Sequence, residues 1–159
     1  MMVLPWFMVA ALAQSAPDVF IEAETSTQHT FSGVGEFEDV VSGGKILRLW
    51  ETVAPPSDGY CATLKFALPA AGLWHMWLAV SIPANTSPWW WRVDRSEWQH
   101  VTLESIPDDQ LTIIRFGVSD CMGWLRLLSA ELTVGEHVLE IRVDERRDIL
   151  EKAYLVYLV

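Results

Sequence analysis

The clearest pattern in the chain is a regular alternation of apolar and polar side chains. It runs through residues 60–68 and again through residues 139–143, where apolar residues occupy every second position. Successive side chains of a β-strand point to opposite faces, so this period of two predicts strands with one buried face and one solvated face. In residues 89–94 the same rule places Trp90 on the face opposite to its two tryptophan neighbours.

Short apolar segments of this kind, separated by glycine, proline and other turn residues, recur along the whole chain. No long segment shows the period of 3.6 with caps at both ends that is typical of a helix. This rhythm predicts an all-β fold, an antiparallel sandwich or barrel, in a single domain spanning residues 18–159. The predicted strands are 19–21, 45–50, 60–68, 73–81, 89–94, 97–103, 111–116, 124–128, 137–143 and 149–159.

The first residues form a separate segment. An uncharged apolar run extends from Val3 to Leu12 and is followed by the small residue Ala13. The run is too short to cross a bilayer, but it has the length of the hydrophobic part of a signal peptide, with a small-x-small cleavage site after it. We therefore expect residues 1–13 to be a signal peptide and the protein to be secreted, periplasmic or on the cell surface. An apolar N-terminal strand or a misassigned start codon is the alternative.

Composition and charge exclude several classes of partner. Hydrophobic residues make up 51% of the chain and charged residues 20%, which indicates a packed globular domain. The formal net charge is −10 and the eleven basic residues are scattered, so no nucleic acid is expected as a partner. Beyond the leader no segment is long and uncharged enough to cross a bilayer, so no membrane insertion is expected. Any of the nine tryptophans left on the surface would be informative.

The chain carries no recognisable catalytic motif. It contains no G-x-S-x-G, H-E-x-x-H, P-loop or C-x-x-C sequence, and its four histidines are far apart. We therefore predict that the protein is not an enzyme. Cys61 and Cys121 could form a disulfide in an exported protein, and two separate thiols remain the alternative.

Two carboxylates near the start of the domain suggest a cation site. Glu22 and Glu24 are two residues apart on a predicted strand, so they would project on the same face. Like charges side by side repel each other, and a bound cation would relieve that repulsion. A solvated acidic edge is the alternative.

Four segments, in order along the chain, resemble the carbohydrate-binding modules of families 6 and 35. They are FIEAET at 20–25, YCATLKFALPAAGLWHMWLAV at 60–80, SPWWWRVDRSEW at 87–98 and ELTVGEHVLEIRVDERRDILEKAYLV at 131–156. The resemblance covers nearly all of residues 18–159. It implies a galactose-binding-like jelly-roll sandwich that binds a polysaccharide or oligosaccharide without cutting it, alone or beside other domains of a glycan-degrading system.

The resemblance also implies roles for individual residues. A structural calcium would be held by Glu22, Glu24 and Glu151, the last standing where the family usually has Asp. Calcium prefers several oxygen ligands from carboxylates and backbone carbonyls. Trp124 follows a loop at a position where family 6 modules place a tryptophan that stacks on sugar.

Two further residues are candidate sugar contacts. Trp90 is one, because it faces away from the core. Asp148 is the other, because the polar residue that family 6 modules carry near the end of the chain falls here on Ile149, and Asp148 could replace it. The surplus of tryptophan favours a carbohydrate-binding module. The missing polar residue at Ile149 favours the alternative, a structural or adhesive β-sandwich that mediates protein contacts without binding sugar.

Overall fold

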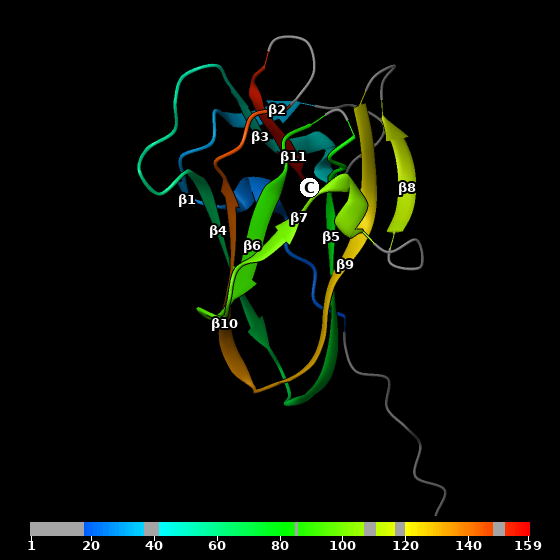
Figure 1. Ribbon diagram of the computed structural model, residues 1–159. Helices are drawn as coiled ribbons and strands as arrows, with labels where there is room; N and C mark the ends of the chain where they lie inside the picture. The colour runs from blue at the N-terminus through cyan, green and yellow to red at the C-terminus, as the bar shows by residue number, and fades with distance from the viewer. Residues whose placement is uncertain (1–17, 37–41, 85, 107–110, 117–119, 148–151) are drawn as a thin grey trace, which may run out of the picture.

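The computed structural model describes residues 18–36, 42–84, 86–106, 111–116, 120–147 and 152–159, with the backbone alone for 42, 111–116, 120 and 121. Within these residues the chain forms two antiparallel sheets packed face to face (Figure 1). The predicted all-β two-sheet sandwich is therefore confirmed. Its jelly-roll strand order remains a prediction.

The first sheet, sheet A, has the order β1-β4-β10-β6-β7. Its strands are β1 (Gln28–His29), β4 (Tyr60–Leu68), β10 (Gly135–Val143), β6 (Trp89–Val93) and β7 (Gln99–Val101). The second sheet, sheet B, has the order β2-β3-β11-β5-β9-β8. Its strands are β2 (Gly33–Glu36), β3 (Lys45–Glu51), β11 (Tyr154–Leu158), β5 (Gly72–Ser81), β9 (Asp120–Leu132) and β8 (Leu111–Phe116). Three short 3₁₀ turns complete the fold: η1 (Ala23–Thr25), η2 (Ser42–Gly44) and η3 (Leu103–Ser105).

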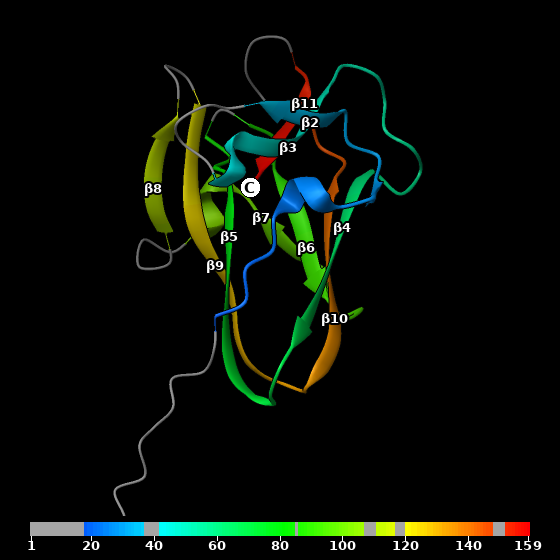
Figure 2. The ribbon, with the colours of Figure 1, turned by 180° about the vertical axis from the view of Figure 1, so that it is seen from behind.

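Two connections at one end of the sandwich carry the chain from one sheet to the other. Residues 69–71 join β4 to β5, and residues 133–134 join β9 to β10 (Figures 1 and 2). Each connection ends on a glycine with positive φ, Gly72 at +152° and Gly135 at +120°. A side chain is strained in that conformation, so glycine is the natural residue at both positions.

The core lies between the sheets and follows the alternation of the sequence. In β10 the residues Leu139, Ile141 and Val143 are buried, while the residues between them are partly exposed. In β6 the indole of Trp89 is fully buried, and Trp90 lies on the opposite face as predicted. Burial of this apolar surface is the main force that holds the two sheets together.

Three predictions about the strands need correction. Residues 19–21 do not form a strand but lead, without strand pairing, into η1. The short strands β1 and β2 were not predicted, because two residues in one case and two glycines in the other give little β signal. β9 is longer than the predicted 124–128, since it pairs with β5 on one side and β8 on the other.

One edge within sheet B is incompletely paired. β5 pairs with β9 from Gly72 to Ser81, but among the described residues its other edge pairs with β11 at Val80 alone. One further backbone hydrogen bond, from Val159 N–H to the Ala79 carbonyl, ends that contact. Among the residues that the structure describes, the first half of β5 therefore pairs with a strand on one side only, which leaves an opening at its other edge.

Where the chain is described, it contains no helix of the length and hydropathy needed to cross a membrane.

Candidate functional site

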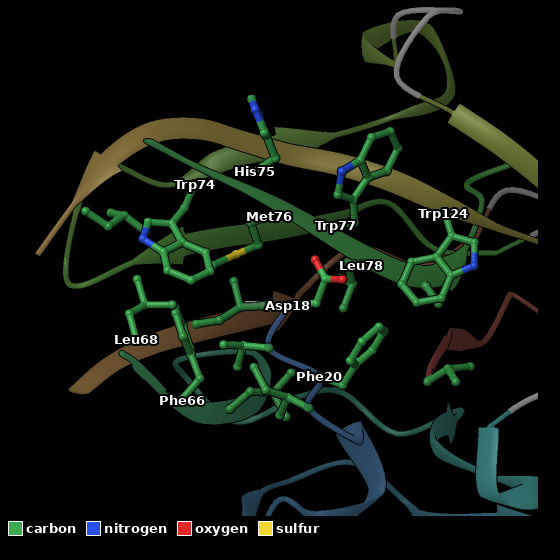
Figure 3. A pocket seen from close by; sticks show the side chains of 17 residues that line it. Asp18, Phe20, Phe66, Leu68, Trp74, His75, Met76, Trp77, Leu78 and Trp124 are labelled. Atoms are coloured by element: carbon green, nitrogen blue, oxygen red, sulfur yellow. The ribbon is translucent and has the colours of Figure 1, made fainter. Parts of the chain in front are cut away.

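An apolar cleft of about 460 Å³ lies at the unpaired edge of β5 (Figure 3). It extends between the two sheets and around that edge, so residues from both faces of β5 line it. Residues 18–21 line it as well. A volume of this size is within the usual range for pockets that bind small ligands.

The inner wall of the cleft is apolar on both sides. Phe66 and Leu68 of β4 lie across from Trp74 and Met76 of β5, and Figure 3 shows these four side chains directed toward one another. The one polar atom of the Trp74 side chain, Nε1, donates a hydrogen bond of 3.1 Å to the carbonyl of Ala70. The wall built by these four residues therefore presents hydrocarbon, sulfur and ring faces.

The outer side of the cleft carries two exposed indoles. Trp77 of β5 is 42% exposed and Trp124 of β9 is 38% exposed. The strand register pairs Trp77 with Arg126 and Ala79 with Trp124, so the two tryptophans are diagonal neighbours on one face of the sheet. The guanidinium carbon of Arg126 lies 5.8 Å from the centre of the Trp77 ring. We call Trp77 and Trp124 the aromatic platform.

Polar groups in or beside the cleft come from three elements. Asp18 and His75 line the cleft, and Figure 3 shows His75 directed to the same side as Trp77, away from Phe66. The His75 Nδ1 atom lies 2.8 Å from the hydroxyl of Ser129 on β9. Arg126 adds a positive charge beside Trp77. The site thus combines ring faces with hydrogen-bonding groups at its rim.

Of the sugar-contact residues predicted from the sequence, Trp124 lies in the cleft and Trp90 lies elsewhere. Trp90 is on the outer face of sheet A, where its ring stacks on His100 with centroids 4.0 Å apart. Its Nε1 donates a 3.0 Å hydrogen bond to Asp144, and the Arg142 guanidinium carbon lies 5.2 Å from the ring centre. Asp148 lies outside the described residues.

The predicted metal ligands are described only in part. Glu22 and Glu24 are not on one face of a strand, because Glu22 caps η1 and Glu24 lies within it. Glu24 Oε2 is buried without a hydrogen-bond partner among the described residues. Its Oε1 lies 3.6 Å from the point where a Cβ would stand on Gly43. Glu151 lies outside the described residues, and the remainder contain no group of three side chains placed to hold a metal.

Among the side chains of sheet A with shifted pKa values are His137 and Cys61, and neither lines the cleft. The hydrogen bond that the His137 ring donates to Asp94 raises the pKa of His137, and the Thr133 carbonyl facing the other ring nitrogen adds to the shift. Burial raises the pKa of the Cys61 thiol, which is free and donates to the carbonyl of Asp58.

Comparison with protein-family models gives no match, and comparison with curated proteins gives no significant match.

Sequence reasoning missed most of the cleft. Trp77 carried a usable signal, because Trp74 and Trp77 are three residues apart on a predicted strand and must face opposite sides. One of the two therefore had to point away from the core. Asp18 and Phe20 gave no signal, since they reach the cleft through the path of the chain ahead of η1.

Proposed function

We propose that the protein is a non-catalytic carbohydrate-binding module whose sugar site is the aromatic platform at the cleft. The observation that carries the proposal is the exposure of Trp77 and Trp124 side by side on neighbouring strands. Large aromatic side chains are normally buried, because each apolar Å² left in water costs about 25 cal/mol. Exposed rings grouped at a cleft therefore indicate a ligand that covers them.

The chemistry of the platform suits a sugar. A pyranose ring offers C–H groups on its faces, which pack against indole, and hydroxyl groups at its edge, which need directional partners. Asp18 can accept hydrogen bonds, Arg126 can donate them and His75 can do either. Among the described lining residues Asp18 is the single carboxylate. Glycoside hydrolysis usually uses two, so this set favours binding over cleavage.

A glycan array with the purified protein tests the proposal. We expect binding to at least one class of polysaccharide or oligosaccharide, and loss of that signal in the double variant Trp77→Ala/Trp124→Ala. The matched control is Trp50→Ala, which removes a tryptophan of similar exposure from β3, outside the cleft lining. An array on which the wild type binds no glycan would contradict the proposal.

A structural calcium near η1 belongs to the same proposal. Glu22, Glu24 and Glu151 would hold it together with backbone carbonyls, and the buried unpaired oxygen of Glu24 is the observation in its favour. A cation bound by the folded state alone adds about 2.7 kcal/mol at a hundredfold excess over its Kd. Its effect would be to fix the start of the domain against η2.

Thermal unfolding in calcium and in EDTA tests the calcium site. We expect millimolar calcium to raise the melting temperature of the wild type and to leave Glu24→Gln unchanged. In EDTA the variant should be at least as stable as the wild type, because a neutral amide costs less to bury than a carboxylate oxygen without a hydrogen-bond partner. Glu104→Gln, an exposed residue of η3, is the control that should keep the calcium response. Equal wild-type melting temperatures in calcium and EDTA would rule the site out.

A second candidate function is supported by a different observation. Beside the platform Phe20 is 82% exposed, and it lies next to the unpaired edge of β5. An exposed strand edge with apolar side chains around it can accept an extended segment of another protein. The domain would then be the adhesive or structural sandwich that the sequence left as its alternative.

A further inference from the structure

The interior of the cleft differs chemically from its rim. Between the sheets, Leu64, Phe66 and Leu68 of β4 face Trp74, Met76 and Leu78 of β5. All of these side chains are apolar apart from the Trp74 N–H, which the carbonyl of Ala70 already accepts. A sugar placed among these six side chains would lose its water without gaining hydrogen bonds from them, which is costly for every hydroxyl group. The interior therefore suits a hydrocarbon.

The size of the cleft is sufficient for a chain of carbons. A dry apolar cavity of about 150 Å³ can hold a benzene ring, and this cleft measures about 460 Å³. From Trp74 to Leu78 the strand advances by about 13 Å, at roughly 3.3 Å per residue. An alkyl chain of about ten carbons fits within that length and volume. Met76 has a flexible side chain that can adapt to it.

The opening of the cleft is continuous with the aromatic platform. Trp77 and Trp124 line the same cleft as the interior residues, and so does Phe20. Phe20 is 82% exposed, so an apolar segment passing through the opening would cover a ring that otherwise faces water. One ligand could thus contact the hydrocarbon interior and the exposed indoles together.

We propose that the ligand is an amphipathic glycoconjugate, with a hydrocarbon chain in the cleft and a sugar ring on Trp77 and Trp124. The assignment of the sugar end depends on the proposed function, whereas the assignment of the hydrocarbon end depends on the cleft alone. The ligand class is therefore an acylated or alkylated saccharide, and a free polysaccharide would use only part of the site.

Titration with alkyl glucosides tests this proposal. The probes are methyl, hexyl, octyl and decyl β-glucoside below their micellar concentrations, with binding followed by tryptophan fluorescence and calorimetry. We expect the Kd to fall by about fourfold for each added methylene from hexyl to decyl, in line with the transfer of one methylene from water. A Kd that does not change with chain length overturns the proposal and leaves the carbohydrate-binding function standing.

Variants that fill the cleft locate the chain. Met76→Trp and Leu132→Phe add bulk to the lining and should weaken decyl glucoside at least tenfold while leaving methyl glucoside unchanged. Val34→Trp, at an exposed position on β2, is the control with added bulk elsewhere. A cooperative melt must accompany each variant. The chain-length series on the wild type decides the question even if a variant fails to fold. If both variants fold and both bind decyl glucoside with wild-type affinity, the alkyl chain does not lie in this cleft and the proposal is overturned.

A decyl chain on a tetraethylene glycol head tests the sugar end separately. We expect this probe to bind at least fivefold more weakly than decyl glucoside, and the difference to vanish in Trp77→Ala/Trp124→Ala. Equal binding of both probes to the wild type, unchanged in the double variant, would contradict the sugar assignment and the proposed function together. That result would mean that the cleft binds an apolar chain but no saccharide, and it would overturn the proposal that the ligand is a glycoconjugate.

Discussion

The outer faces of the two sheets both carry tryptophan, in different surroundings. On sheet A, Trp90 stacks on His100, and the Arg142 guanidinium lies near both Trp90 and Trp98, 4.8 Å from the Trp98 ring centre. On sheet B, Trp77 and Trp124 stand at the opening of a cleft and are about two-fifths exposed. One face uses its indoles for internal contacts, and the other presents them to solvent.

This difference shows which tryptophans can serve as a site. On sheet A the side chain of Arg92 is also paired, since it donates two hydrogen bonds, of 2.6 and 3.0 Å, to Glu140. A ligand would have to displace those partners before reaching a ring. At the platform the described structure places only Arg126 over Trp77. Accessible ring faces, rather than the number of tryptophans, therefore distinguish the candidate site.

The largest expected effect concerns a third kind of tryptophan, the buried Trp89. Trp89→Ala should lower the free energy of unfolding by about 3–5 kcal/mol, as truncation of a buried aromatic does. Trp124→Ala should cost about half as much, because water can refill the space left at the surface. Urea unfolding measures both.

A matched substitution sharpens that comparison. The Trp89 N–H is buried without a partner among the described residues, so Trp89→Phe should cost much less than Trp89→Ala. If Trp124→Ala destabilises the fold as strongly as Trp89→Ala, Trp124 is a packing residue and the platform loses half of its surface.

The next effect concerns His137 of β10 and its contact with Asp94, the residue that follows β6. His137 Nδ1 lies 2.5 Å from Asp94 and its Nε2 lies 2.9 Å from the Thr133 carbonyl, so both ring nitrogens face acceptors. Only the protonated ring can donate to both. The raised pKa of His137 means that this stabilisation is complete below its unfolded pKa of about 6.5 and is lost as pH rises through the folded pKa.

Unfolding free energy measured from pH 5 to pH 9 tests this linkage. Asp94→Asn should lower stability by about 1–3 kcal/mol at pH 5.5, the usual range for hydrogen bonds to charged groups. The gap between wild type and variant should narrow toward pH 9. A gap that is constant over the whole range would show that Asp94 does not raise the pKa of His137. Sugar binding should be unaffected, since both residues lie outside the cleft lining.

The smallest effect is the coupling between a ring and a cation on sheet A. A double-mutant cycle with Trp90→Ala and Arg142→Ala should give an interaction energy of about 0.5–1 kcal/mol, as for cation–π contacts near the surface. Denaturant unfolding of the four proteins measures it. An interaction energy of zero would mean that Arg142 does not stabilise the Trp90 ring in its position. Trp90 would then again be a candidate ligand contact.

Two strands could be predicted with their exact bounds, and in β4 the alternation of apolar and polar residues was the signal. The bounds of β4 and β8 match residues 60–68 and 111–116 as predicted. The apolar residues of 19–21 also indicated a strand, but a strand needs a partner, and the described structure pairs this segment with none. Sequence shows the propensity of a segment and does not show which edge it will meet.

Only part of the candidate site could be predicted from the sequence. The resemblance pointed to Trp124, and the structure places that residue at the cleft. The cleft itself arises because β11 meets β5 at a single residue pair, a tertiary feature with no local pattern. Trp90 was predicted to face outward and does so. Its stacking on His100, which comes from β7, depends on strand pairing that alternation alone does not specify.

The most direct test is to measure the Kd of the glycan that binds most strongly on the array. The titration is done with the wild type and with Trp124→Ala, Trp77→Ala and Trp90→Ala. Loss of either platform ring should weaken binding by about 1–3 kcal/mol, roughly 5- to 150-fold, by analogy with aromatic stacking on other planar ligands. Trp90→Ala should change the Kd by less than about twofold, because its ring contacts His100 and Arg142. Wild-type affinity in both platform variants, with a large loss in Trp90→Ala, would contradict the account and move the site to sheet A.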